Sequence, residues 1–256
     1  MNKQLEGKVA VITGGGQGVG FGIAQEFVEN GASVVLTGRR RAMLDEAVTR
    51  LGPKSSGIVA DVSKLSEMEA MFKEVMARHG RLDAVVANAI TNANGPLGTI
   101  TEEQWDRTFD TNAKGVLFSI QPALPLLSRG GTIVIIGSTA SVSPPPSMSL
   151  YAGAKAAVRC MVRCWIQDIK GSGIRINVLS AGAVDTPSLR SALEAASGAA
   201  NVDAAVKTMG EGNPLGRLAD PREIGKAVVF LASDASSFIT GVELFADGGM
   251  VQVSGA

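Results

Sequence analysis

The chain has few of the residues that metal sites and disulfides require. Its 256 residues include one histidine, His79, and two cysteines, Cys160 and Cys164. No second Cys or His pair accompanies the cysteines, so we predict no metal site and interpret both as core thiols on a helix. His79 precedes Gly80 at the expected end of a helix, where an imidazole can meet the last carbonyls. A Ser/His/Asp triad would need this residue, and nothing near it resembles a nucleophile.

Net charge and long hydrophobic runs are also missing. Lys and Arg total 24, Asp and Glu total 24, and the basic residues cluster only at Arg39, Arg40 and Arg41. An extended nucleic-acid surface is therefore not expected. No apolar run reaches the ~18 residues that span a bilayer, and Gly7 and Lys8 precede any hydrophobic segment that could act as a signal peptide. The prediction is a soluble, cytoplasmic protein without a nucleic-acid or membrane partner.

The chain does have ample hydrophobic content and a regular alternation of local patterns. Hydrophobic residues make up 45% of the sequence, enough for the core of one domain. Short β-branched runs alternate with segments of helical period, which indicates βαβ units in a parallel sheet. Strands are expected at 8–13, 33–37, 57–60, 82–87, 132–136, 175–179 and 242–245, and helices at 18–30, 41–51, 63–79, 101–127 and 150–170.

Some of these segments carry further expectations. Ser63 is expected to cap the helix 63–79, and Thr101 the helix 101–127, which Gly115 and the prolines at 122 and 125 should bend or shorten. The prolines at 144–146 predict a stiff loop. Residues 183–214 are rich in Ala, Ser and Gly and have weak helical periodicity. We interpret this segment as a mobile substrate lid.

The most informative pattern is the order Ser138, Tyr151 and Lys155. Tyr151, the only tyrosine, lies four positions before Lys155, so on a helix the ammonium lies near the phenol and favours the phenolate. A hydroxyl such as that of Ser138 could hydrogen-bond a carbonyl oxygen while the tyrosine gives or takes its proton. The pattern predicts carbonyl/alcohol interconversion. For the Tyr/Lys pair alone, an exposed lysine beside a partly buried tyrosine is the alternative.

A glycine-rich turn follows the first expected strand. Residues 13–20 read TGGGQGVG and open the first helix. Glycine lets backbone approach a pyrophosphate closely, and a helix N-terminus supplies free N–H groups. The GxGxxG spacing is absent, and no Gly-Lys-Ser/Thr follows to make a P-loop. Tight packing alone is the alternative for such a turn.

Together these motifs resemble the short-chain dehydrogenase/reductase family from end to end of the chain. The matching motifs are Thr13-Gly14 with Gly18 and Gly20, Asp61-Val62, Asn88-Ala89, Asn112, the Ser138/Tyr151/Lys155 set, Asp185-Thr186-Pro187 and Asp247-Gly248-Gly249. The resemblance implies a Rossmann-type, doubly wound α/β fold. Its seven-stranded parallel sheet would carry helices on both faces, with a nicotinamide cofactor over the carboxyl ends of the strands. It also implies one dinucleotide-binding and catalytic domain over residues 1–256 and a homotetramer. In that tetramer the helices after the fourth and fifth strands would pair across one two-fold axis, and residues 247–256 would meet another subunit.

The resemblance further implies a role for each matching residue. In the turn that Thr13 opens, Gly14, Gly18 and Gly20 would hold the pyrophosphate. Lys155 would hold the nicotinamide ribose beside Tyr151, and Asn112 would bind a water that links Lys155 to solvent. The remaining cofactor contacts would be Asp61 and Val62 at the adenine, Asn88 in the cofactor cleft and Thr186 at the nicotinamide carboxamide.

Two positions depart from the family pattern. Ile90 stands where the family usually has Gly, and Ala181 stands where it usually has Pro. A β-branched residue at 90 would be strained at positive φ, which would displace the turn beside the cofactor. Ala181 frees a φ angle that proline would fix. Neither departure removes a reacting group.

The residues after the second strand predict the cofactor preference. A site for NAD needs a carboxylate about 20 residues beyond the glycine turn, but here Gly38, Arg39, Arg40 and Arg41 follow the strand and no acidic residue comes before Asp45. Arg39 could face a 2′-phosphate, and Gly38 leaves room for it. We therefore expect NADP(H) to be preferred over NAD(H). Arg40 and Arg41 are interpreted as the start of a solvated helix, and Gln17 stands where NADP-preferring relatives often carry a basic residue.

The expected function is hydride transfer between NADP(H) and a ketone, aldehyde or secondary alcohol, with Tyr151 as general acid/base. The alternatives are an NAD-dependent alcohol dehydrogenase and a non-catalytic nucleotide sensor of the same fold. Residues 91–97 and the lid are expected to line the substrate pocket, and Val142, Met148 and Leu189 hint that it is apolar.

Overall fold

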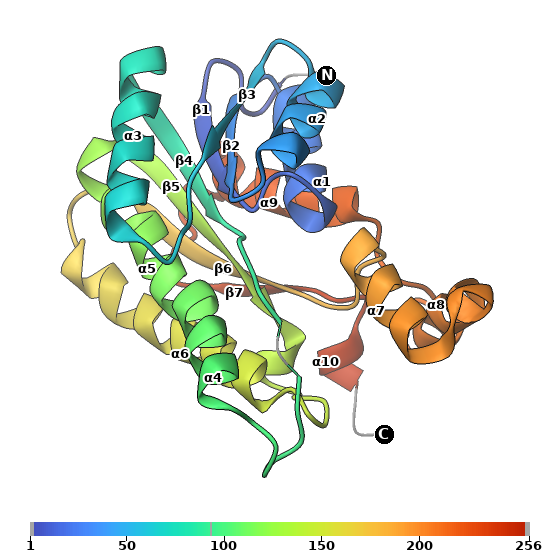
Figure 1. Ribbon diagram of the computed structural model, residues 1–256. Coiled ribbons are helices and arrows are strands. Elements are labelled where there is room, and N and C mark those ends of the chain that lie inside the picture. The colour runs from blue at the N-terminus through green and yellow to red at the C-terminus, as the bar shows by residue number, and fades with distance from the viewer. Residues whose placement is uncertain (1–2, 93, 254–256) are drawn as a thin grey trace.

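A computed structural model describes residues 3–92 and 94–253 (Figure 1). Seven strands form one parallel sheet in the order β3-β2-β1-β4-β5-β6-β7. This confirms the predicted Rossmann-type α/β sheet. The strands are β1 Val9–Thr13, β2 Ser33–Gly38, β3 Ser55–Val59, β4 Leu82–Ala87, β5 Leu127–Ser138, β6 Arg175–Ala181 and β7 Glu243–Ala246.

Helices cover both faces of the sheet, as Figure 1 shows. One face carries α1, α2 and α9, and the other carries α3, α5 and α6. The α-helices are α1 Gly18–Glu29, α2 Arg41–Leu51, α3 Leu65–His79, α4 Glu102–Phe109, α5 Gly115–Ile120, α6 Ser149–Asp168, α7 Pro187–Ser197, α8 Val202–Glu211, α9 Pro221–Ala232 and α10 Met250–Val253.

Each central strand is buried on both sides. In β1, Ala10 and Ile12 belong to the core under α1, where Phe27 is buried. Val11, which points the opposite way, belongs to the core under α3 with Phe72. Side chains alternate across a strand, so burial of both faces requires the continuous apolar runs that the sequence shows.

The direction of strand order reverses at β1, which pairs with β2 on one side and β4 on the other. Ligands of open α/β sheets bind at such a point, outside the carboxyl ends of the strands. The glycine turn follows β1 and Asn88 follows β4. Both predicted cofactor motifs thus lie at this edge of the sheet.

Two helix predictions needed correction. Lys64, not Ser63, is the N-cap of α3, because the backbone and hydroxyl of Ser63 hydrogen-bond to Asp61 Oδ1 instead. The capping box of Thr101 is present, but the single helix expected at 101–127 is not. A π-helical turn, Asp110–Lys114, follows α4, and α5 ends at Ile120 before a short 3₁₀ turn.

The expectation that Cys160 and Cys164 are core thiols is wrong, because both are exposed. Helix α6 buries Val158 and Val162 against the sheet, and the two cysteines face away from it. His79 does end α3, and Gly80 follows in the left-handed conformation. Its Nε2 atom is buried without a hydrogen-bond partner in the described part of the chain, so the expected contact with helix carbonyls is not made through that atom.

Within residues 3–92 and 94–253, no helix is long and apolar enough to cross a membrane.

Candidate active site

The turn between β1 and α1 can be built only from glycine at two positions. Gly14 has a φ of 65°, and a Cβ on it would lie 2.9 Å from the Cα of Ala89. A Cβ on Gly20 would lie 2.3 Å from the carbonyl oxygen of Gly14. The N-terminus of α1 has no side-chain cap at Gln17, so its first N–H groups are available to an anion. The turn therefore fits a pyrophosphate.

Hydrogen bonds join this turn to the end of β4. The hydroxyl of Thr13 accepts from the backbone N–H groups of Asn88 at 3.0 Å and Ala89 at 3.1 Å. The Asn88 amide donates to the carbonyl oxygens of Thr13 at 2.9 Å and Gly14 at 3.2 Å. Thr13 is only 1% exposed. It holds the two strand ends together and does not itself line the groove above them.

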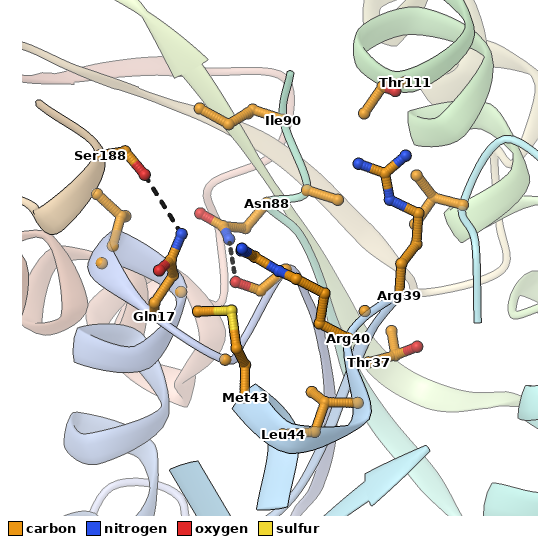
Figure 2. A pocket seen from close by; sticks show the side chains of 18 of the residues that line it. Gln17, Thr37, Arg39, Arg40, Met43, Leu44, Asn88, Ile90, Thr111 and Ser188 are labelled. Atoms are coloured by element: carbon orange, nitrogen blue, oxygen red, sulfur yellow. Dashed lines mark hydrogen bonds between the residues drawn. The ribbon is translucent and has the colours of Figure 1, made fainter. Parts of the chain in front are cut away.

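A groove of about 450 Å³ lies over these strand ends (Figure 2), within the size range of ligand pockets. Its walls come from the glycine turn, the ends of β2, β3 and β4, and the start of α7. The predicted cofactor residues that line it are Gly14, Gly18, Gly20, Gly38, Arg39, Asp61, Val62, Asn88 and Thr186. The hydroxyl of Thr186 also caps α7 by accepting from Leu189 N at 3.2 Å.

The basic end of the groove holds two arginines instead of one. Arg40 lines the groove together with Arg39, which the sequence did not predict. It is also exposed and is the N-cap of α2, as expected for the start of a solvated helix. Arg41 is exposed and forms an ion pair with Asp45 at 3.8 Å, as expected for a solvated helix start.

Asp61 is the acidic residue of the groove lining. Partial burial pushes the pKa of its carboxyl up, but hydrogen bonds from the backbone and hydroxyl of Ser63, aided by the charges of Arg39 and Lys64, bring the pKa below its ordinary value. Asp61 is therefore a fixed carboxylate acceptor at the end of β3, where the adenine contact was predicted.

The departure at Ile90 does not displace the turn through strain. Ser147, with a φ of 65°, is the non-glycine residue at positive φ in the described ranges, so Ile90 adopts an ordinary backbone conformation. Ala181 ends β6, paired with Ser138 of β5 and Ala246 of β7. Both departures are compatible with a regular sheet edge.

Ser138, Tyr151 and Lys155 converge at the carboxyl end of β5. Ser138 is the last residue of that strand, and α6 carries the other two. The Ser138 hydroxyl lies close enough to the Tyr151 phenol to affect its pKa, and it accepts from Ala140 N at 3.2 Å. Lys155 Nζ donates to the carbonyl oxygen of Ile136 at 2.7 Å and lies 5.7 Å from the centre of the Tyr151 ring.

Burial controls the protonation of this set. It raises the pKa of the Tyr151 phenol above its ordinary value, although the nearby Ser138 hydroxyl acts in the opposite direction. The expectation that Lys155 favours the phenolate therefore fails for the protein alone. Burial also lowers the pKa of the Lys155 ammonium to about 8, which weakens the charge that the expectation relied on.

Asn112 lies in the π-helical turn and is fully buried. Its Oδ1 accepts from Thr91 N at 3.0 Å, and its Nδ2 donates to the Thr91 carbonyl oxygen at 2.7 Å. The oxygen and the nitrogen of the Asn112 amide therefore both bind the backbone of Thr91. These bonds tie the π-helical turn to the segment after β4. The predicted water between Asn112 and Lys155 stays a prediction.

Comparison with known proteins places this site in a family. The family model described as enoyl-(acyl carrier protein) reductase, one of those for short-chain dehydrogenases/reductases, matches residues 14–251. The chain belongs to the short-chain dehydrogenase/reductase family. Members are oxidoreductases that transfer hydride with a nicotinamide dinucleotide, and the chain is an enzyme of this kind acting on small molecules.

The similar proteins include several oxidoreductases of almost equal length. An oxidoreductase of Sarocladium schorii is 42% identical over 98% of both chains. A hydroxynaphthalene reductase-like protein of Metarhizium guizhouense is 34% identical over 97% of both. A 3-oxoacyl-[acyl-carrier-protein] reductase of Thermotoga maritima is 32% identical over 97% of this chain and 99% of its own.

A solved structure of similar fold is the ligand-free aldohexose dehydrogenase of Thermoplasma acidophilum. It has a TM-score of 0.92 and 27% identity, and the match covers 100% of this chain and 98% of that one.

The segment after β6 borders the groove through Thr186 and Ser188. Residues 183–214 contain α7 and α8, so helix content is higher than the weak periodicity predicted. Ser188 at the start of α7 lines the groove and accepts from Gln17 Nε2 at 3.3 Å. Ser188 was not predicted as a groove residue, because that contact joins residues 171 positions apart in the sequence.

The segment after β4, which is expected to line the substrate pocket, contacts the proline-rich loop. Gly95 N donates to the Ser147 carbonyl oxygen at 2.9 Å, which joins the segment after β4 to the proline-rich loop. Of the predicted 91–97 segment, residue 93 lies outside the described residues. Val142 is exposed, while Met148 and Leu189 are partly buried; their contact with substrate stays a prediction.

Proposed function

We propose that the protein is an NADP(H)-dependent carbonyl reductase, or in the reverse direction an alcohol dehydrogenase, with Tyr151 as general acid/base. The observation that carries this proposal is the convergence of Ser138, Tyr151 and Lys155 at the end of β5, one strand away from the glycine-lined groove. The bound dinucleotide would supply or accept the hydride.

The protonation states favour a proton donor. The ordinary pKa of a tyrosine is 10.0 and burial raises that of Tyr151 further, so the phenol carries its proton near neutral pH and would give it to the oxygen of a carbonyl that accepts hydride. The Ser138 hydroxyl, which lies near that phenol, would orient and polarise the same oxygen. Lys155, held by the carbonyl of Ile136, would bind the cofactor ribose and Asn112 would support the relay.

The preference for NADP(H) is supported by the charges at the end of β2. Arg39 and Arg40 both line the groove there, and a planar guanidinium suits a phosphate. A Cβ at Gly38 would meet only Leu44 Cδ2, at 3.9 Å, so Gly38 leaves open space. The groove residues Gly14, Gly18 and Gly20 would hold the pyrophosphate, and Asp61, Val62, Asn88 and Thr186 would contact the rest.

Steady-state kinetics with both cofactors test this preference. The parent is expected to have the higher kcat/KM with NADPH. Gly38→Asp and Arg39→Ala should each move the ratio of kcat/KM values towards NADH by about tenfold or more, because one adds repulsion to a 2′-phosphate and the other removes attraction. Arg41→Ala is the matched control and should leave the ratio unchanged. A parent that prefers NADH would overturn the preference.

A ketone substrate is supported by the relatives, whose names describe reductases of 3-oxoacyl and hydroxynaphthalene compounds. The test is consumption of NADPH with a panel of apolar ketones and aldehydes. Tyr151→Phe serves as the blank for turnover. If the parent turns over no member of the panel and oxidises none of the corresponding alcohols with NADP, the proposed activity is wrong.

A further inference from the structure

Ile90 is an apolar side chain held in the open part of the groove. It follows Asn88 and Ala89 at the end of β4, lines the groove, and is 53% exposed. Figure 2 shows its side chain extending across the groove towards the wall that carries Gln17 and Ser188. A half-exposed isoleucine inside a ligand groove has apolar surface left to bury.

The backbone on both sides of Ile90 is held by hydrogen bonds. On one side, Asn88 and Ala89 donate to the buried hydroxyl of Thr13. On the other, Thr91 is bonded through both backbone groups to Asn112, and its hydroxyl accepts from Arg107 Nε at 3.2 Å. Ile90 therefore cannot move out of the groove without breaking these bonds, and its branched Cβ restricts its rotamers.

The opposite wall carries a contact between two segments far apart in sequence. Gln17 of the glycine turn donates to the hydroxyl of Ser188 at the start of α7. Thr186 lies against the same turn, since a Cβ on Gly18 would be 3.4 Å from its methyl group. The groove is thus bounded by a fixed apolar side chain on one side and by a polar bridge on the other.

We propose that Ile90 packs on the bound dinucleotide and is a positioning residue that retains it in the groove. The inference rests on the proposed function and goes beyond it. Ile90 stands where the family usually has glycine, and a glycine has no side chain to close this wall of the groove. The exposed half of the side chain would be buried by the ligand, and water would be excluded from that side. The rigid backbone means that no ordering of Ile90 opposes this contact.

An isosteric pair of variants separates this packing from a structural role. Ile90→Val keeps the branched apolar surface, whereas Ile90→Thr has the same shape as valine but places a hydroxyl against the ligand. The dissociation constant of NADPH, measured by fluorescence titration, is expected to stay within about twofold for Ile90→Val and to rise about tenfold for Ile90→Thr. Ile90→Gly should weaken binding at least as much.

The matched control is Val242→Thr, the same chemical change at an exposed valine that does not line the groove. It should leave the NADPH dissociation constant unchanged. Melting temperatures of the Thr and Val variants at position 90 should agree within about 2 °C, because the side chain is already half exposed.

Each outcome has one meaning. Weaker binding by Ile90→Thr with retention by Ile90→Val supports the inference. Equal or tighter binding by Ile90→Thr while the parent binds NADPH overturns the role of Ile90 and leaves the proposed function standing. A parent that binds neither NADPH nor NADH overturns the proposed function, and the role of Ile90 with it.

Discussion

At the scale of single residues, Tyr151 is the proposed proton donor. Its phenol has an ordinary pKa of 10.0, which burial raises, so it is protonated near neutral pH when the reaction begins. Tyr151→Phe removes the proton donor and keeps the ring. We expect kcat/KM for ketone reduction to fall by about 10²-fold to 10⁴-fold, while the NADPH dissociation constant stays within about twofold. Activity near the parent level would contradict the role of Tyr151.

Lys155 gives a pH-dependent prediction at the same scale. Its pKa is lowered from 10.5 to about 8 by burial, so between these pH values the unfolded chain binds more protons than the folded one. Stability from this group therefore rises with pH across the window, by up to about 3 kcal/mol. Denaturant unfolding of the parent and of Lys155→Met at pH 7 and pH 10 should show the parent gaining on the variant.

The same variant tests the cofactor contact. Lys155→Met should raise the NADPH dissociation constant and lower kcat, because it removes a proposed ribose contact as well as the ammonium beside Tyr151. Unchanged affinity for NADPH would argue against the ribose contact. A constant stability gap between parent and variant from pH 7 to pH 10 would argue against the lowered pKa.

At the scale of elements, α7 and α8 are the least anchored part of the fold. No residue of α7 is buried, and in α8 only Gly210 is; Figure 1 shows both helices projecting from the body. Arg190 of α7 bonds Asp185 through two nitrogens at 2.6 and 2.8 Å and Asp203 of α8 at 2.8 Å. Segments with few buried contacts open most easily, which supports the proposed mobile lid over 183–214.

Amide hydrogen exchange tests the lid. The amides of α7 and α8 are expected to exchange faster than those of α1 in the protein alone, and to slow when NADPH is added. Arg190→Gln should speed exchange in α7 and α8 further because it removes the links to Asp185 and Asp203. Arg163→Gln, on the exposed face of α6, is the control. Equal protection of α1 and α7 would refute a mobile lid.

The elements also show what a sequence can predict. The positions of the strands and of most helices could be predicted from the spacing of apolar residues. That spacing shows whether an element is buried on one face or on both. The π-helical turn at Asp110–Lys114 contains Asn112, whose amide bonds to Thr91, 21 residues away, and local patterns do not contain such a contact. Whether Arg40 lines the groove and whether Cys160 is exposed likewise depend on how their helices lie against the sheet. The pKa of Tyr151 depends on how deeply the folded chain buries its phenol.

At the scale of the whole molecule, an aromatic side chain is exposed on the surface where a partner subunit was predicted. Trp105 on α4 is 51% exposed and stacks on Phe109 with ring centres 4.3 Å apart. Helix α4 packs beside α6, whose Cys160 and Cys164 are exposed. Aromatic residues are enriched in protein interfaces, so this surface supports the proposed pairing of the helices that follow β4 and β5.

Light scattering tests the proposed homotetramer. The parent is expected to have four times the 26.3 kDa mass of one chain. A tetramer with two kinds of two-fold interface separates into dimers when one kind is broken, so Trp105→Glu, which places a charge in the α4 and α6 surface, should halve the measured mass. Leu97→Glu, at an exposed leucine in the loop before α4, is the control and should keep the parent mass. A parent that scatters as a single chain at micromolar concentration would rule out the tetramer, and a tetrameric Trp105→Glu would place the interface elsewhere.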